Sequence, residues 1–335
     1  MAKEPEIPDQ SNQMPIIAGE PREWSVSKLP RGAQQRFIQA AISMLGGVLE
    51  GGADLRSKGG VNVVGYSNVQ YKPGVVESYL SSASDNPIRL HFAMEESVKV
   101  KRRLSMIDEC VERLDKNTNV EDTPSDDGAI EPEWMDQFKY YSDFISSKKA
   151  KAAFSEVLSR EIMKPGQFSK KALRYLFEMD RNVAEEFSRI YSEYGLGNFL
   201  FIPDNKKKEF FNSLFSLKSE NLIDSISDSI YVRFFPMDGT RIIDVRLKDY
   251  ALMFYIFDHE KRPDFNIDCI GLTHTGSEIS KLIDRSDPDL QLRLLKNVYP
   301  HITIPSRRIA IHRNTGSELD HESEAVEVIL DFGVK

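Results

Sequence analysis

The sequence predicts a mainly helical α+β protein, in which a helical bundle is followed by a winged-helix-like unit with a small antiparallel sheet. Two patterns predict this class. Between residues 134 and 220, apolar side chains recur every three or four residues in short runs that brief turns separate, which is typical of a helical bundle. Beyond residue 229, segments rich in aromatic and β-branched residues follow one another, which is typical of β-strands.

Length and composition favour more than one structural unit. The chain has 335 residues, of which 40% are hydrophobic, so it can bury a sizeable core and form roughly two or three units. Its 44 basic and 52 acidic residues leave a net charge of -8, which disfavours general adhesion to nucleic acid or to an anionic membrane. Any nucleic-acid site is therefore expected to be a local patch.

Cysteine usage and hydropathy favour a reducing compartment. Cys110 and Cys269 lie far apart, so they predict neither a disulfide framework nor a metal knuckle. Residues 1–10 lack the basic start and apolar core of a secretory signal. No run approaches the roughly 20 apolar residues that a spanning helix needs. We expect a soluble, cytoplasmic protein without a membrane span.

Shifts in composition divide the chain into segments. Residues 1–30 carry scattered prolines, acids and amides without an apolar period, and residues 117–133 combine acids with proline and glycine. The expected segments are a disordered tail (1–30), an N-terminal amphipathic helix and hairpin (31–87), a long helix and acidic linker (88–133), a helical bundle with the winged-helix-like unit (134–285), and a C-terminal helix and β-hairpin (286–335).

A helix and a hairpin are predicted near the N-terminus. Apolar residues share one helical face from Phe37 to Leu49, although Gly46 and Gly47 lower the helix propensity there. Residues 59–74 alternate β-branched and aromatic residues with turn formers, which predicts a hairpin. Its glycines match no phosphate-binding pattern.

The predicted long helix carries a seam of apolar residues, spaced alternately by four and three positions. The members of this seam are Val100, Leu104, Ile107, Val111 and Leu114. Such a seam is typical of a self-associating coiled coil, and an ordinary helix packed inside one chain gives the same pattern. A run of basic residues on the same helix predicts either a solvated face or a contact to phosphate. The run consists of Lys99, Lys101, Arg102 and Arg103.

The bundle helices have recognisable ends. Ser146 or Ser147 is a natural N-cap between the first two helices, and the turn 164–166, Lys-Pro-Gly, ends the second. Ser169 and Asp180 are expected to cap the two helices that follow.

Four motifs occur in an order that resembles a known family. They read FSEVLSRE at 154–161, KPGQFSKK at 164–171, EMD at 178–180 followed by Ala184 and Phe187, and LTHTGSEI at 272–279. Over about residues 90–285 the chain resembles the domain of unknown function 2806 family of bacteria and phages. It departs from the family pattern at Arg160, Ala172 and Val183, where glycine, threonine and aspartate are expected.

The resemblance implies a helical fold and no particular chemistry. The family has no established activity or catalytic residues, so no site residue and no cofactor is carried over from it. It is similar in organisation to proteins of phage-exclusion and mobile-element loci, which suggests a link to phage defence or to mobile elements.

The stretch NIDCIGLTHTGSEISKLI, residues 266–283, predicts a strand that runs into a helix. Thr275 and Glu278 fit a capping box at the start of that helix. A strand that returns into a helix in this way is typical of a winged-helix wing, and on that hypothesis the segment 206–220 is the recognition helix. It would present to nucleic acid the polar residues Lys206, Lys207, Lys208, Asn212 and Lys218. The alternative is that these lysines are solvated and that the unit contacts protein, which the acidic chain and the lack of arginine in this helix favour.

No standard catalytic motif occurs in the sequence, and no catalytic residue is predicted. The nearest approach to a metal cluster is formed by His301, His312, Glu318, His321 and Glu322. Histidines on strand faces usually bind no metal, so no metal site is predicted. Asp244 and Lys248 are the basis for considering a nuclease. Near the end of the chain, the segment from Arg307 to Arg313 is expected to pair with residues 325–330 as a closing hairpin.

These observations predict a non-enzymatic interaction or regulatory protein that uses no cofactor. A protein partner or self-association is the first expectation. The alternatives are a nucleic-acid-binding winged-helix protein and a metal-dependent nuclease. Nucleic-acid affinity that falls with salt would indicate the first alternative, and a requirement for a divalent ion would indicate the second.

Overall fold

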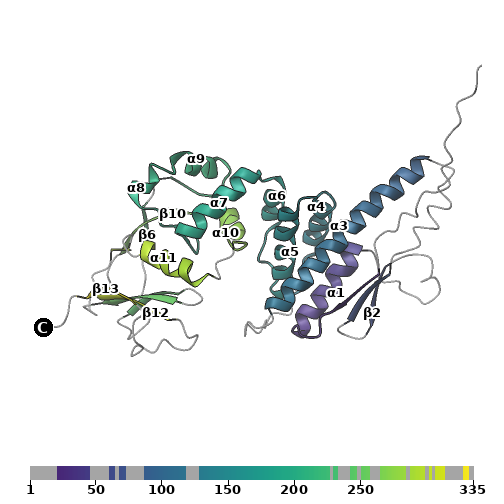
Figure 1. The fold of residues 1–335 in the computed structure, drawn as a ribbon, viewed down its shortest axis with the longest axis horizontal. Coiled ribbons are helices and arrows are strands. Elements are labelled where there is room, and N and C mark those ends of the chain that lie inside the picture. The colour runs from purple at the N-terminus through teal and green to yellow at the C-terminus, as the bar shows by residue number, and fades with distance from the viewer. Residues whose placement is uncertain are drawn as a thin grey trace, which may run out of the picture. The chain divides into compact units, whose positions relative to one another are not determined.

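The chain forms two compact units, residues 1–177 and residues 178–335, each of which is described by itself. The computed structural model (Figure 1) describes residues 21–45, 60–64, 68–72, 87–117, 128–226, 229–232, 242–246, 250–256, 265–283, 287–298, 302–303, 306–313 and 327–331. Within these residues, no helix combines the length and the apolarity that crossing a bilayer requires. The boundary after Phe177 falls inside the segment 134–285 that the sequence analysis treats as one unit.

A small antiparallel sheet opens the first unit. Its strands, in the order β1-β3-β2, are β1 (Arg22–Ser25), β2 (Gly60–Val64) and β3 (Asn68–Lys72). The hairpin expected over residues 59–74 is confirmed, with Val63 opposite Val69. The expectation of a disordered tail is wrong for residues 21–30, because β1 pairs with β3 and buries Trp24. Residues 1–20 lie outside the described part of the chain.

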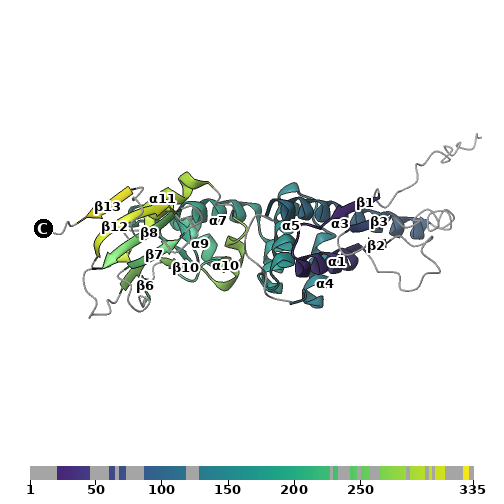
Figure 2. The same cartoon turned by 90° about the horizontal axis from the view of Figure 1, so that it is seen from below.

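Helices form the rest of the first unit. They are α1 (Arg31–Leu45), α3 (Pro87–Asn117), α4 (Pro132–Ser142), α5 (Lys148–Met163) and α6 (Lys170–Glu178). The first of them, α1, contacts β2 and the helices α3, α4 and α5, so it lies between the sheet and the bundle (Figures 1 and 2). Large side chains such as Phe37, Phe138 and Phe154 are fully buried and form the core.

The apolar seam of α3 faces this core. Leu104, Ile107 and Leu114 are buried, while Val100 and Val111 are half-buried. The helix contacts α1, α4 and α5 of its own unit. The seam is therefore packed inside the chain, which leaves little of it for the self-association that the spacing also suggested.

The motif KPGQFSKK forms a tight connection between α5 and α6. Gly166 adopts a left-handed φ of 80°, which favours glycine. The buried carboxylate of Glu161 accepts hydrogen bonds from the backbone N–H groups of Gly166 and Gln167. Trp134 donates its indole N–H to the carbonyl of Phe168 at 2.7 Å, and Ser169 accepts from the N–H at the start of α6. The residues of this motif therefore stabilise the fold.

Short elements and three sheets build the second unit. The helices are α7 (Arg181–Tyr194), α8 (Asp204–Lys207), α9 (Phe211–Ser219), α10 (His274–Ser280) and α11 (Pro288–Val298). The strands are β4 (Gly195–Leu196), β5 (Phe199–Leu200), β6 (Ser229–Val232), β7 (Ile242–Arg246), β8 (Tyr250–Ile256), β9 (Phe265–Asp268), β10 (Ile270–Gly271), β11 (Ile302–Thr303), β12 (Ser306–Arg313) and β13 (Glu327–Asp331). They pair in the orders β10-β5-β4, β11-β9-β6 and β13-β12-β8-β7. Helix α11 contacts both α7 and β8 and lies between them (Figure 1).

Two expectations for the C-terminal part of the chain are confirmed. A helix, α11, follows residue 286, and β12 pairs with β13 in antiparallel fashion as the closing hairpin. The hairpin is extended by β8, which pairs with the other edge of β12. Aromatic and β-branched residues in β8 fit such a central strand.

The segment LTHTG differs from its expected geometry. The helix begins two residues earlier than a capping box at Thr275 and Glu278 requires, because Thr273 is the N-cap and accepts from the N–H of Gly276 at 3.0 Å. Thr273 also donates its hydroxyl to the carbonyl of Asn221 at 2.6 Å. A Cβ on Gly276 would lie 2.0 Å from the carbonyl oxygen of Leu222, so only glycine fits against this backbone. The segment therefore fastens the chain that leaves α9.

Candidate interaction surface

The residues predicted to contact nucleic acid lie on α8, on α9 and in the turn between these helices. The expectation of one helix over 206–220 is wrong, because residues 208–210 form a turn between α8 and α9. At the break, Phe210 turns inward and is buried. Its ring packs edge-on against Tyr194 at 5.7 Å, and the guanidinium of Arg189 lies 4.9 Å from the ring centroid. Burial of this aromatic ring favours the interruption of the helix.

The inner face of α9 anchors the helix in the second unit. Leu214 and Leu217 are fully buried, and the helix contacts α7. Ser213 donates a hydrogen bond to Glu186 of α7. At its C-terminal end, Asn221 takes a left-handed φ of 58°, and Leu222 donates its N–H to the carbonyl of Leu217 at 2.9 Å. The helix is thus held along its length and at its end.

The outer face of α9 exposes two large aromatic side chains. Phe211 and Phe215 are 55% and 60% exposed, and they lie four residues apart on one face of the helix. Exposed polar residues flank them on the same face. We call the set Lys208, Phe211, Asn212, Phe215 and Lys218 the α9 surface.

The exposure of the two phenylalanines was not predicted from the sequence. In the sequence they join Phe210, Leu214 and Leu217 in what reads as one apolar run. A helical wheel would have predicted this exposure, because Phe211 and Phe215 fall outside the arc that Phe210, Leu214 and Leu217 share. An apolar arc too wide for one buried face indicates a second contact surface.

The predicted lysines are not equivalent in the structure. The ammonium group of Lys206 lies 2.7 Å from Glu209, and its hydrogen bond to that carboxylate raises the pKa of Lys206. Lys207 lies 3.0 Å from Asp204. Lys208 and Lys218 are exposed and form no ion pair with any described residue. With four lysines against three carboxylates over residues 204–220, the local charge is close to neutral.

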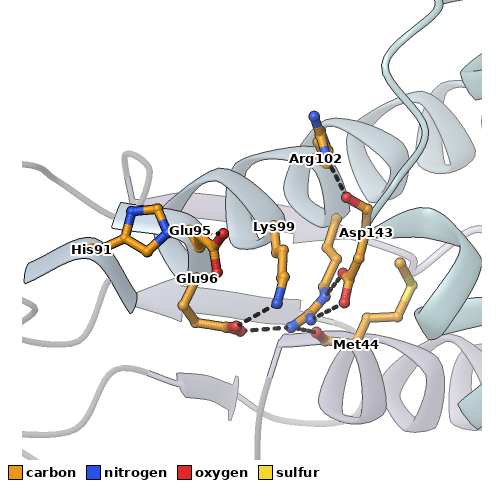
Figure 3. A network of polar contacts seen from close by, with 8 residues as sticks. Met44, His91, Glu95, Glu96, Lys99, Arg102 and Asp143 are labelled. Carbon is orange, nitrogen blue, oxygen red and sulfur yellow. Dashed lines mark hydrogen bonds and ion pairs between the residues drawn. The ribbon is translucent and has the colours of Figure 1, made fainter. Parts of the chain in front are cut away.

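The basic run of α3 has a structural role. Arg103 is buried and donates to both carboxylate oxygens of Asp143, at 2.5 and 2.6 Å, and to the carbonyl of Met44 at 3.3 Å. Figure 3 shows how Arg102 reaches the backbone oxygen of Asp143 and how Lys99 approaches Glu96. This network links α3 to the end of α4. Most of the basic residues of this run therefore contact groups of the same chain instead of being available to bind phosphate.

The residues considered for chemistry are only partly described. Asp244 lies on β7 and His312 on β12, whereas Lys248, His301, Glu318, His321 and Glu322 lie outside the described residues. In the described part of the chain, no group of three His, Cys, Asp or Glu residues is placed to hold a metal ion. Cys110 and Cys269 are free and buried, and burial raises the pKa of the Cys110 thiol.

Comparison with known families finds a match over part of the chain. Residues 99–227 match the model of the family described as protein of unknown function (DUF2806), which confirms the resemblance expected from the motifs. The matched residues include the turn between α5 and α6 and all of the α9 surface, and they end before the LTHTGSEI motif. No curated protein and no solved structure matches the chain.

Proposed function

We propose that this protein is a non-enzymatic interaction protein and that the α9 surface binds a protein partner. The observation that carries the proposal is the exposure of Phe211 and Phe215 on a helix whose opposite face is fully buried. Large apolar side chains that are exposed together and held on a rigid element are typical of interaction sites.

The chemistry of the surface favours protein over nucleic acid. Aromatic side chains four residues apart act as paired anchors when a helix docks into an apolar groove. Lys208 and Lys218 lie at the two ends of the aromatic pair, so they favour a groove with an acidic rim. The near-neutral local charge disfavours binding to phosphates, and the interrupted helix is too short to act as a recognition helix in a nucleic-acid groove.

The setting of this contact is proposed from the family resemblance and the cysteines. We propose that the partner acts in phage defence or in the function of mobile elements. Free, buried cysteines suit a cytoplasmic protein.

Photo-crosslinking tests the proposal in the intact protein. A photoreactive phenylalanine analogue at position 211 or 215 is expected to capture one protein in the native host. The purified captured protein should then bind the wild-type chain, and Phe211→Ala/Phe215→Ala should weaken that binding at least tenfold, as loss of aromatic anchors does.

The matched control is a second pair of exposed aromatic residues in the other unit. Tyr140 and Phe144 are 58% and 51% exposed, so Tyr140→Ala/Phe144→Ala removes a similar amount of apolar surface. This control should leave the affinity unchanged. Equal losses in both double variants, or crosslinks from positions 211 and 215 to nucleic acid alone, would refute the proposal.

A further inference from the structure

An exposed aromatic cluster lies at the ends of α4 and α6 in the first unit. It consists of Tyr140, Tyr141, Phe144 and Phe177, which we call the aromatic platform. Tyr140 lies 5.6 Å from Tyr141 and 5.2 Å from Phe144 between ring centroids, and Tyr141 stacks on Phe177 at 4.7 Å. Three of its rings face solvent, with exposed fractions of 58% for Tyr140, 51% for Phe144 and 37% for Phe177.

The chain beneath the platform is held firmly. Tyr141 is buried, and its hydroxyl accepts a hydrogen bond from Gln137 at 2.9 Å. Phe144 donates its N–H to the carbonyl of Tyr141 at 3.0 Å. Asp143, directly before Phe144, accepts hydrogen bonds from the guanidinium of Arg103. The entropy lost when a ligand covers the outer rings is therefore small, because the backbone that carries them is already ordered.

The part of the chain that carries the platform is locally basic. Residues 128–177 hold nine lysines and arginines and six carboxylates, a net charge of +3 in a chain of -8. Five of those carboxylates already accept hydrogen bonds from this unit, namely Glu131, Glu133, Asp143, Glu156 and Glu161. The platform therefore lies in a stretch of the chain that carries an excess of positive charge.

Several lysines close to the platform in the sequence keep their charge available. Lys139 precedes Tyr140, Lys148 opens the helix after the turn that carries Phe144, and Lys171 lies on α6 with Phe177. None of these three forms an ion pair with a described carboxylate. The segments that carry the platform thus combine exposed aromatic rings with lysines that form no ion pair.

We propose that the aromatic platform binds single-stranded nucleic acid, with unpaired bases stacked on Tyr140, Phe144 and Phe177 and phosphates near the lysines. Bases of any sequence have a π-face that stacks on aromatic side chains, and lysines favour the phosphate backbone. A duplex does not offer this contact, because its bases already stack on one another. The proposal is independent of the protein contact at the α9 surface.

Fluorescence anisotropy of the full-length protein tests this site. Labelled oligothymidylate, oligouridylate and a duplex of equal length are titrated at low and at physiological salt. We expect the single strands to bind more tightly than the duplex, with affinity that falls as salt rises. Tyr140→Ala/Phe144→Ala should weaken single-strand binding about tenfold or more, because each stacked base loses its aromatic face.

Further variants separate stacking and charge from a change in fold. Tyr140→Phe/Phe144→Tyr keeps both rings and should bind like the wild type. Lys148→Glu/Lys171→Glu should weaken binding and flatten its salt dependence. Phe211→Ala/Phe215→Ala, at the other exposed pair, should have no effect. Absence of single-strand binding at low salt, or equal binding by Tyr140→Ala/Phe144→Ala, overturns the proposal and leaves the platform as a surface for protein contact.

Discussion

Single residues decide how the two units hold their helices. Arg103 offers the clearest case, because it is a charged side chain in a buried position that satisfies a buried carboxylate and a backbone carbonyl together. A buried pair of this kind costs much desolvation, and the loss of one partner leaves the other charge uncompensated. Its contacts join residues 40 positions apart in the sequence, from α3 to the end of α4.

Replacement of Arg103 by alanine should therefore destabilise the first unit. We expect the free energy of unfolding to fall by about 3–5 kcal/mol, because Asp143 loses its bidentate partner. Urea denaturation followed by tryptophan fluorescence measures the loss. Lys101→Ala, at an exposed position of the same helix, should change the stability by less than about 0.5 kcal/mol. Similar values for the two variants would show that the buried pair contributes little.

At the scale of elements, α9 has two faces with different tasks. Its inner residues Leu214 and Leu217 are fully buried, whereas Phe211 and Phe215 face solvent. Burial fixes what each face contributes to stability, since only side chains removed from water on folding contribute hydrophobic free energy. The two pairs of residues thus allow folding and binding to be separated on one short helix.

We expect the two faces to respond differently to truncation. Leu214→Ala or Leu217→Ala should lower the free energy of unfolding by about 2–5 kcal/mol, because each leaves a cavity. Phe211→Ala/Phe215→Ala should change it by no more than about 1 kcal/mol. Chemical denaturation followed by circular dichroism measures both. A large loss in the phenylalanine pair would indicate a structural role for the α9 surface and would weaken the proposed partner contact.

Elements with a strong local signal were predicted from the sequence. Ser147 caps α5 as expected, because the cap depends only on neighbouring residues. Features set by distant contacts were missed. Strand β1 is too short to show a period and exists through its pairing with β3, and the break before α9 depends on the burial of Phe210 beside Tyr194. The heptad spacing of α3 was seen, but spacing alone does not tell a partner in the same chain from one in a second copy.

At the scale of the whole molecule, the candidate sites also depend on contacts that the sequence alone does not reveal. The five residues predicted to contact nucleic acid were chosen for their polar and charged side chains, yet Lys206 and Lys207 form ion pairs with nearby carboxylates. The aromatic platform was not predicted, because Phe177 of α6 joins the rings at the end of α4 only through the fold. Each site lies within one unit, and each unit has its own buried core.

Separate cores predict that the two units unfold in separate transitions. Both tryptophans, Trp24 and Trp134, lie in the first unit, so tryptophan fluorescence follows that unit alone, while circular dichroism follows both. Gly276→Ala forces a Cβ against the carbonyl of Leu222 and should destabilise the second unit by roughly 1–3 kcal/mol. We expect this variant to shift part of the dichroism transition and to leave the fluorescence transition in place, whereas Arg103→Ala should do the reverse. If either substitution moves both signals together, the chain unfolds as one cooperative body and effects at one candidate site cannot be separated from the other.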